Sequence, residues 1–365
     1  MKSSYLYKRL TTNVCMLLLL MGCSWDAVTE GGAEEGVVLE NTASEDVMSE
    51  DTVPENSLSE HMEEVTFISW EEAGLEDHVM EWEDDGLESD MREITGIADR
   101  DIMLSDVWEY TELDLSYVIG EHLPPDICIE NISALRELTN LQILDLGMNR
   151  IIDISALGEL INLRELDLMS NSISDISALS GLENLEKLHL RFNDLDDISA
   201  LGGLTNLQEL DLMSNSISDI SALSGLRNLE KLELGFNDLS DLSALSGLTN
   251  LRELSLMSTS ISDISVLNEL RNLEKLELGI NDLEGINALS NLSNLRVLGL
   301  RGTGLSDISA LSGLENLQVL NVAENQINDL SALSGLTNLR ELFISENPLS
   351  PDAYSIVSFV ENIYY

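Results

Sequence analysis

Apolar residues recur at fixed positions in nine consecutive blocks of 22 residues, and this pattern dominates the chain. Each block follows L-x-x-L-x-L-x-x-N-x-I-x-D-I-S-A-L-x-x-L-x-N with few exceptions. The blocks begin at Leu141, Leu163, Leu185, Leu207, Leu229, Leu251, Leu273, Leu295 and Leu317. A unit this short cannot bury its apolar face alone, so the repetition predicts a solenoid in which neighbouring units share one core.

Within each block, the alternation of apolar and polar residues predicts one short strand followed by one helical turn. Positions one, four and six are apolar and should point inward, so positions three, five and seven should face solvent on the concave side. Position three alternates Glu and Lys from Glu165 to Lys275, which predicts a ladder of cross-strand ion pairs.

Two polar columns of the repeat predict backbone hydrogen bonds. Position nine is usually Asn, whose buried amide can bond the backbone at the turn that leaves each strand. Thr259 and Thr303 replace it and predict weaker turns. Position thirteen is usually Asp, which we expect to cap the N–H groups of the helical turn. A calcium site in this column is disfavoured, because calcium prefers clustered oxygen ligands.

The regular repeats have irregular flanks. Residues 110–349 are predicted to be the repeats, with a loop inserted at Tyr117 to Asp126. Residues 67–109 should form an N-terminal helical cap, with a helix behind Ser69 that carries Trp70, Leu75, Val79 and Trp82. Residues 350–365 should form a C-terminal cap in which Tyr354, Val357 and Phe359 close the core.

The first 66 residues carry no repeat. Lys2, Lys8 and Arg9 precede a short apolar run that ends at Leu20-Met21-Gly22-Cys23. This segment resembles the lipobox of bacterial lipoproteins, which implies a signal peptide at 1–22 and a lipid on Cys23. Residues 23–66 are acidic and lack periodicity, so we expect a disordered tether. The expected location is the outer face of the bacterial cell membrane; the alternative is an ordinary secretory signal.

The repeat itself resembles a known family. The 22-residue unit, the Asp-Ile-Ser-Ala-Leu segment and the lead-in Thr111 to Ser116 are similar to bacterial leucine-rich repeat proteins of the internalin type. The resemblance implies an α/β solenoid, a horseshoe with short parallel strands on the concave face, mostly 3₁₀ segments on the convex face and helical caps at both ends. It also implies adhesion or protein recognition, and no catalysis.

The charge of the chain narrows the class of partner. The sequence has 67 acidic residues against 18 Lys and Arg, a formal net charge of −49. Such a surface repels phosphate backbones, which argues against nucleic-acid binding and favours a neutral or cationic protein or peptide. We expect a monomer. A structural envelope component that binds cell-wall glycan or self-associates is the alternative function.

The candidate partner-binding residues lie where the repeat varies. His189 is at position five between Asp167 and Asp211, whose charges should favour its protonated form. Phe192 and Phe236, at position eight, have an alternative interpretation in which they turn inward and fill the core. The concave strip is predicted to contain Met169, His189, Arg191, Phe192, Met213, Phe236, Met257, Ile280, Arg301 and Phe343.

Chemistry other than binding finds little support in the sequence. No Ser, Cys or His group is placed with a base and an orienting partner, so we assign no catalytic residue, cofactor or metal site. Cys128 lies in an apolar run, which predicts a buried small hydrophobe rather than a reactive thiol.

Overall fold

The computed structural model describes residues 76–117 and 128–365. The chain divides into two units, Met1–Ile68 and Ser69–Tyr365, and the description below concerns the second. The predicted signal peptide, Cys23, the tether and most of the inserted loop lie outside the described residues. Among the residues that are described, no helix has the length and apolar character needed to cross a membrane.

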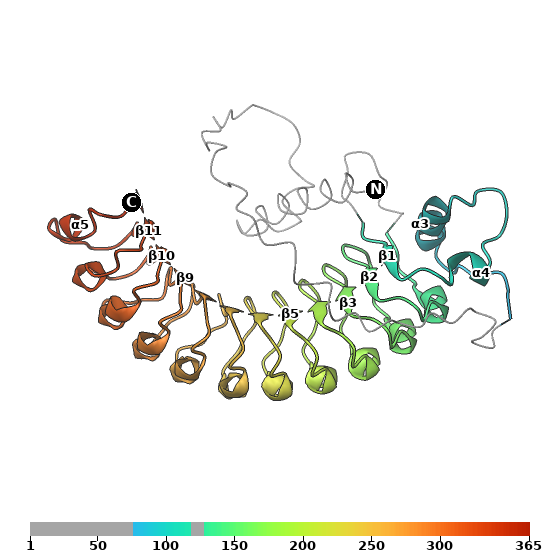
Figure 1. The fold of residues 1–365 in the computed structure, drawn as a ribbon, viewed down its shortest axis with the longest axis horizontal. Coiled ribbons are helices and arrows are strands. Elements are labelled where there is room, and N and C mark those ends of the chain that lie inside the picture. The colour runs from blue at the N-terminus through green and yellow to red at the C-terminus, as the bar shows by residue number, and fades with distance from the viewer. Residues whose placement is uncertain (1–75, 118–127) are drawn as a thin grey trace, which may run out of the picture. The chain divides into compact units, whose positions relative to one another are not determined.

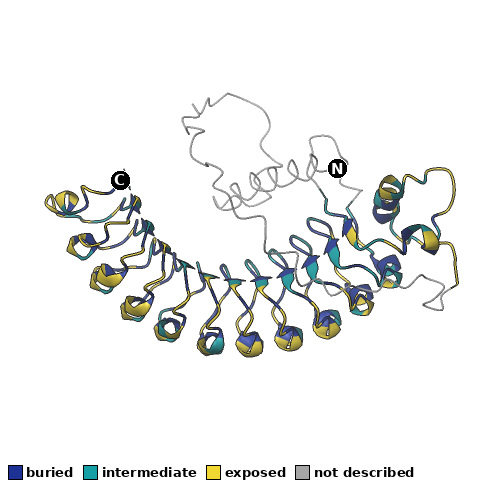
Figure 2. Ribbon diagram, viewed as in Figure 1, coloured by how far each residue is buried: buried dark blue, intermediate teal, exposed yellow. Residues whose placement is uncertain are grey.

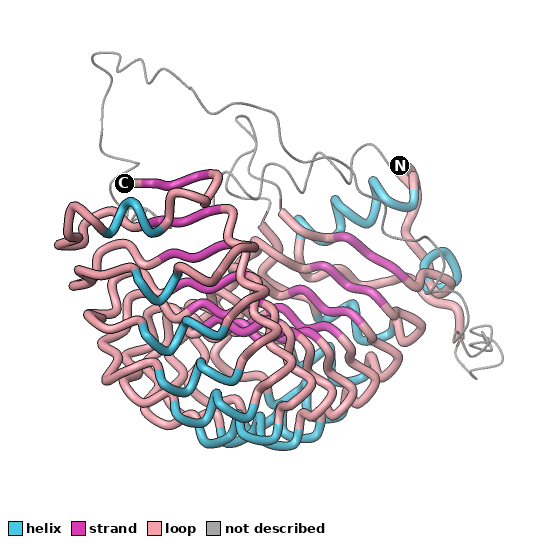
Figure 3. The backbone as a smooth tube through the Cα atoms, turned by 60° about the vertical axis from the view of Figure 1, so that its left-hand side comes forward, coloured by secondary structure: helices cyan, strands magenta, loops and turns pink. Residues whose placement is uncertain are grey.

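The described residues form one parallel sheet in which every strand lies beside its neighbours in the sequence. The register advances by one repeat at each step, so Glu165 pairs with Lys187 and Lys187 with Glu209. The strands line the concave side of an arc (Figures 1 and 3). They are β1 Glu112–Asp114, β2 Ile143–Asp145, β3 Glu165–Asp167, β4 Lys187–His189, β5 Glu209–Asp211, β6 Lys231–Glu233, β7 Glu253–Ser255, β8 Lys275–Glu277, β9 Val297–Gly299, β10 Val319–Asn321, β11 Glu341–Phe343 and β12 Asn362–Tyr364.

A 3₁₀ turn on the convex side follows each of the strands β1 to β10. In the turn after β2, Asp153 Oδ1 accepts from the backbone N–H of Ser155 at 2.8 Å, a hydrogen bond that lowers the pKa of the Asp153 carboxyl. The same contact recurs down the column, as predicted. The turns are η2 Ser133–Glu137, η3 Ser155–Glu159, η4 Ser177–Gly181, η5 Ser199–Gly203, η6 Ser221–Gly225, η7 Ser243–Gly247, η8 Ser265–Glu269, η9 Asn287–Asn291, η10 Ser309–Gly313 and η11 Ser331–Leu333.

The predicted solenoid fold is confirmed, with one continuous core between the sheet and the turns (Figure 2). The apolar columns are almost fully buried; Leu166, Leu168 and Ile173 represent three of them in one repeat. Because each Leu packs on its equivalents above and below, the units share a core that none of them has alone.

The asparagine column forms the predicted hydrogen-bond ladder. Asn171 Nδ2 donates to the backbone oxygens of Leu146 and Leu168 at 3.0 and 3.1 Å. Its Oδ1 accepts from the N–H of Ile151 at 2.9 Å. One amide therefore joins two successive repeats.

The two threonines in this column replace only part of the ladder. The Thr259 hydroxyl donates to Leu256 O at 2.8 Å. Its backbone oxygen accepts from Leu239 N–H at 2.9 Å. At Thr303 the equivalent backbone bond, from Leu283 N–H, is longer, 3.3 Å.

The helix predicted to carry Val79 and Trp82 does not include these two residues. Residues 76–84 are not helical; Val79 forms an isolated bridge with Met103 and is 43% exposed. The helix α3 spans Asp85–Thr95 and ends at Gly96, which has a left-handed φ of 71°. A second helix, α4, spans Leu104–Val107.

Asp84 explains this starting point. One of its carboxylate oxygens accepts from Leu87 N–H at 2.9 Å and caps α3. The other accepts from Glu130 N–H at 2.7 Å, in the first repeat. Trp82 and Trp108 pack on the core, as expected; Trp70 lies outside the described residues.

The C-terminal end also differs from the prediction. The helix α5, Ala353–Ile356, is one turn long, and the chain then adds β12 to the sheet. Val357 is buried, but Tyr354 and Phe359 are 41% and 40% exposed, so the prediction that they close the core is wrong. The reason is that Val360 and Ile363 occupy the core side of this last turn.

The burial of Cys128 also differs from the prediction. It is half-buried, not fully buried as predicted, because it lies at the edge of the inserted loop.

We expect the asparagine column to contribute more to stability than its threonine replacements. Asn237→Ala removes the partners of Leu212 O, Leu234 O and Ile217 N–H. Leaving buried backbone groups unpaired should lower the free energy of unfolding by about 2–4 kcal/mol. Thr259→Val removes one hydroxyl bond and should cost about 1 kcal/mol. Urea unfolding followed by circular dichroism measures both, and equal losses would contradict the ladder's role.

Candidate functional site

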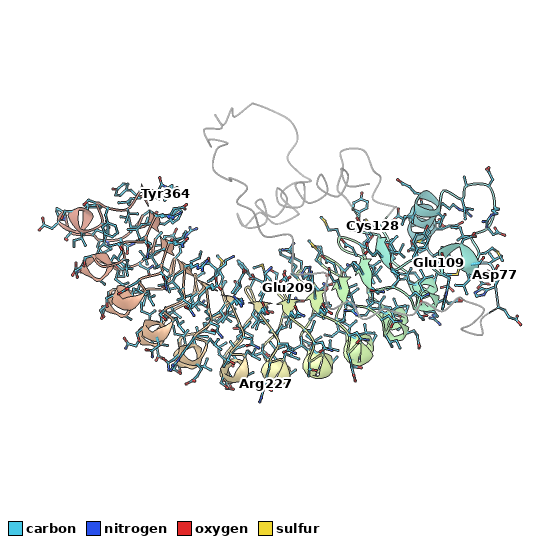
Figure 4. All side chains as sticks on the ribbon, in the orientation of Figure 1. Asp77, Glu109, Cys128, Glu209, Arg227 and Tyr364 are labelled. Atoms are coloured by element: carbon cyan, nitrogen blue, oxygen red, sulfur yellow. The ribbon has the colours of Figure 1, made fainter. Side chains whose placement is uncertain are left out.

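The outward positions of the strands form a continuous surface on the concave side. Figure 4 shows Glu209 on this side of the arc and Arg227 on the convex side. Two steps of the predicted position-three ladder form ion pairs: Lys187 Nζ lies 2.8 Å from Glu165 Oε1 and Lys231 Nζ lies 2.6 Å from Glu209 Oε1. These pairs hold the centre of the sheet in register.

His189 lies between two carboxylates in the centre of this surface. Its Nδ1 is 3.1 Å from Asp167 Oδ2, and its Nε2 is 3.5 Å from Glu209 Oε1. Desolvation would lower the pKa of His189, but the hydrogen bonds to Asp167 and Glu209 outweigh it and raise the pKa to about 9. The hydrogen bond from His189, aided by Lys231, lowers the pKa of Glu209 to about 2. These contacts favour the protonated form of His189, in agreement with the prediction.

His189 lies between Asp167 and Asp211 on the neighbouring strands, as predicted. Its second close carboxylate contact is Glu209, on position three, which the sequence analysis did not name. Asp211 instead accepts from the N–H of Met213 at 3.0 Å and lies 3.7 Å from Arg191. It is only 9% exposed, and this burial raises the pKa of its carboxyl.

The exposure of Met169 also differs from the prediction. It is 9% exposed, so it does not present the open surface predicted for it. Arg191 Nη2 lies 3.5 Å from the Met169 sulfur. The Met169 side chain fills the space above Gly147, which has no Cβ. Met169 therefore packs beneath Arg191.

Position eight has a backbone geometry that sequence reasoning missed. Phe192, Phe236 and Ile280 each have a φ of 57°, in the left-handed region. The N–H of Phe192 donates to Met213 O at 3.0 Å, and the other two residues repeat this bond. The signal available in the sequence was the residue type in most of the other repeats, which is Ser, Gly or Glu at Ser170, Ser214, Ser258, Gly302, Glu324 and Glu346. Met148 holds this position in the first block and has a left-handed φ of 61°.

These three apolar side chains do not fill the core. Phe192 and Phe236 are half-buried and Ile280 is 48% exposed, and all three lie outside the core cluster. The alternative interpretation, in which the phenylalanines turn inward, therefore does not describe this structure. They form a row along the rim of the concave face, at every second repeat.

The other strip residues spread over several strands. Met213 and Met257 are half-buried near the row, and Met213 extends over Gly235. Arg301 is exposed and pairs with Glu324.

Phe343 lies towards the C-terminal end of the sheet. Its ring stacks on Tyr364 with centroids 4.3 Å apart. Sequence reasoning missed Tyr364 because it stands outside the periodic blocks. The strip therefore extends from β3, which Met169 follows, to β9, which Arg301 follows, and Phe343 lies apart from it on β11.

The described residues contain no group of three or more His, Cys, Asp or Glu side chains placed to hold a metal ion.

Comparisons with known proteins point in the same direction as the fold. A family model described as leucine-rich repeats in two copies matches residues 139–182, 161–203, 183–227, 205–247, 227–269 and 315–353. No curated protein matches the sequence.

Three solved structures illustrate the similarity. An internalin (inlF) from Listeria monocytogenes is 28% identical, covers 77% of this chain and 95% of its own, and has a TM-score of 0.56. Internalin C2 from the same organism is 33% identical, covers 60% and 93%, and has a TM-score of 0.55. The plant peptide hormone receptor RGFR1, in complex with RGF2, is 20% identical, covers 63% and 44%, and has a TM-score of 0.52.

We expect the contribution of His189 to stability to depend on pH. Its pKa of about 9 lies above the unfolded value near 6.5, so protonation favours the folded state. The stabilisation should be complete below about pH 6.5 and disappear as the pH rises through about 9. Because a third of the side chain is exposed, we expect about 1–2 kcal/mol.

Urea unfolding of the parent chain and of His189→Gln at several pH values measures this difference. Lys187→Gln is the control, because a lysine keeps its charge over this range. A His189→Gln difference that stays constant with pH would contradict the assignment.

Proposed function

Since the chain belongs to the leucine-rich repeat proteins of the internalin type, we propose that it is a non-catalytic recognition protein whose concave face binds a protein or peptide. The fold alone does not specify a ligand. The argument therefore depends on the residues of the concave strip.

The observation that carries the proposal is the row Phe192, Phe236 and Ile280. A left-handed backbone costs a residue with a Cβ roughly 1–2 kcal/mol, and a β-branched residue such as Ile280 is especially unfavourable there. Core packing does not offset this cost, because the side chains lie outside the core. Strain of this kind at apolar residues outside the core is typical of binding sites.

The surroundings of the row fit a neutral or cationic partner. Half-buried Met213 and Met257 lie beside it and can adapt to different shapes. Carboxylates dominate the neighbouring columns, and the net charge of −49 attracts cationic segments over long distances. RGFR1 with RGF2 illustrates that the fold is compatible with a bound peptide.

The lipobox-like segment supports a proposal on location. A diacylglyceryl group on Cys23 would anchor the protein to the outer face of the bacterial membrane, because two acyl chains bind a bilayer stably. The acidic segment that follows would hold the repeats away from the surface.

The anchor proposal predicts that cells fed a clickable fatty acid label the full chain and do not label Cys23→Ala. Cys128→Ala is the matched control and should label like the parent chain. Label retained on Cys23→Ala would exclude a lipid on this residue.

The recognition proposal is tested by selecting peptides from a random display library against the full chain. A triple variant with Phe192→Ser, Phe236→Ser and Ile280→Ser carries the residue that other repeats have at this position. Selected peptides should bind it at least about tenfold more weakly, a loss of about 1.4 kcal/mol. The melting temperature should not fall.

The matched control replaces Ser170, Ser214 and Ser258 by Ala in the same column and should leave peptide affinity unchanged. Equal peptide affinity of the triple variant and the parent chain would contradict the proposal. A large fall in its melting temperature would assign the row a packing role instead.

A further inference from the structure

A polar groove runs along one flank of the repeats, beside the N-terminal ends of strands β6 to β11. It has a volume of about 590 Å³ and lies outside the concave strip. Its lining contains no apolar residue: it consists of Glu230, Asn250, Arg252, Asn272, Glu274, Asn294, Arg296, Asn316, Gln318 and Asn338.

Five asparagines from position twenty-two form one wall of the groove. Each Nδ2 donates to a backbone oxygen of the preceding repeat; for Asn272 this is Thr249 O at 2.8 Å, and for Asn294 it is Arg271 O at 3.0 Å. The bond fixes the orientation of the amide. No donor among the described residues reaches the oxygens of these amides, so they form a row of available acceptors.

The other wall carries alternating charges at position two. Arg252 lies 3.5 Å from Glu230 and 3.0 Å from Glu274. Arg296 lies 3.6 Å from Glu274 on the other side. Both arginine side chains remain more than half exposed, at 58% and 59%, so they keep free donors. The two glutamates and two arginines of this wall have no net charge, although the whole chain has a net charge of −49.

We propose that this groove binds a linear, uncharged oligosaccharide. Hydroxyl groups both donate and accept, which matches a surface where arginine donors face amide and carboxylate acceptors at every repeat. A peptide would need pockets for its side chains, and the groove has no apolar pocket. The groove has no net charge that would favour the binding of an ionic polymer.

The repeat spacing also favours a chain-like ligand. Six successive strands about 4.8 Å apart span roughly 24 Å, so equivalent polar groups recur along an extended line. This site is independent of the concave strip and does not rest on the proposed function.

The test is isothermal titration calorimetry of the full chain with cellohexaose and hexa-N-acetylchitohexaose, both of which are uncharged. The variant combines Arg252→Met and Arg296→Met, which removes the side-chain donors without touching the asparagine bonds. At least one hexaose should bind the parent chain, and the double variant should lose at least tenfold in affinity. Arg164→Gln is the control, because it breaks a similar 3.0 Å pair with Glu186 outside the groove.

The triple serine variant of the concave row should bind the hexaose like the parent chain, which separates this site from the proposed function. No binding of either hexaose to the parent chain would overturn the proposal. So would equal affinity of the double variant, or binding of a hexaserine peptide in place of the saccharides.

Discussion

The asparagine column is the constraint on which the rest of this solenoid depends. Each amide bonds backbone groups of its own turn and of the neighbouring repeat, for example Asn193 Nδ2 to Leu168 O and Leu190 O. Buried backbone groups must be paired, so this bond fixes both the shape of the turn and the distance to the next one. Once every repeat has the same turn, residues at one position form straight rows on the surface. The concave strip and the flank groove are two such rows.

The periodic part of the fold could be predicted because its interactions are local and repeated. The inward leucines, the Asp153-type caps and the Lys187–Glu165 pair follow from the period alone. The ends could not be placed as well, because they occur once. The N-terminal helix begins where Asp84 can bond both Leu87 and the first repeat, a contact that no periodicity indicates.

The site was less predictable than the fold, and the errors have a common physical cause. The period assigns a side chain to a face but does not choose its rotamer. The ring of His189 contacts Glu209 on position three as well as Asp167 in its own column, and the Met169 side chain packs over Gly147, which has no Cβ. The left-handed backbone of Phe192 was hidden for the opposite reason: the turn imposes it on every repeat, whatever residue is present.

The acidic surface lowers the stability of the folded state, and this effect is largest on the concave face. Burial raises the pKa of Asp211 and of Glu233, whose carboxyls also repel each other. Burial likewise raises the pKa of Glu277, which extends over Gly299. Raised carboxyl pKa values oppose folding at neutral pH, and this penalty decreases as the pH falls. A cationic group placed among these carboxylates would relieve the same penalty, so the face is more favourable for such a partner than for solvent alone.

The spacing of the apolar row sets a geometric condition on that partner. Phe192, Phe236 and Ile280 recur at every second repeat, so they are roughly 10 Å apart when strands are about 4.8 Å apart. A peptide in the polyproline II conformation advances about 3.1 Å per residue with three residues per turn, so every third side chain lies on the same face, roughly 9 Å apart. A peptide that crosses the strands along the row would therefore present every third side chain to one of these residues. The side chains between them would face the carboxylates, which favours basic residues at those positions.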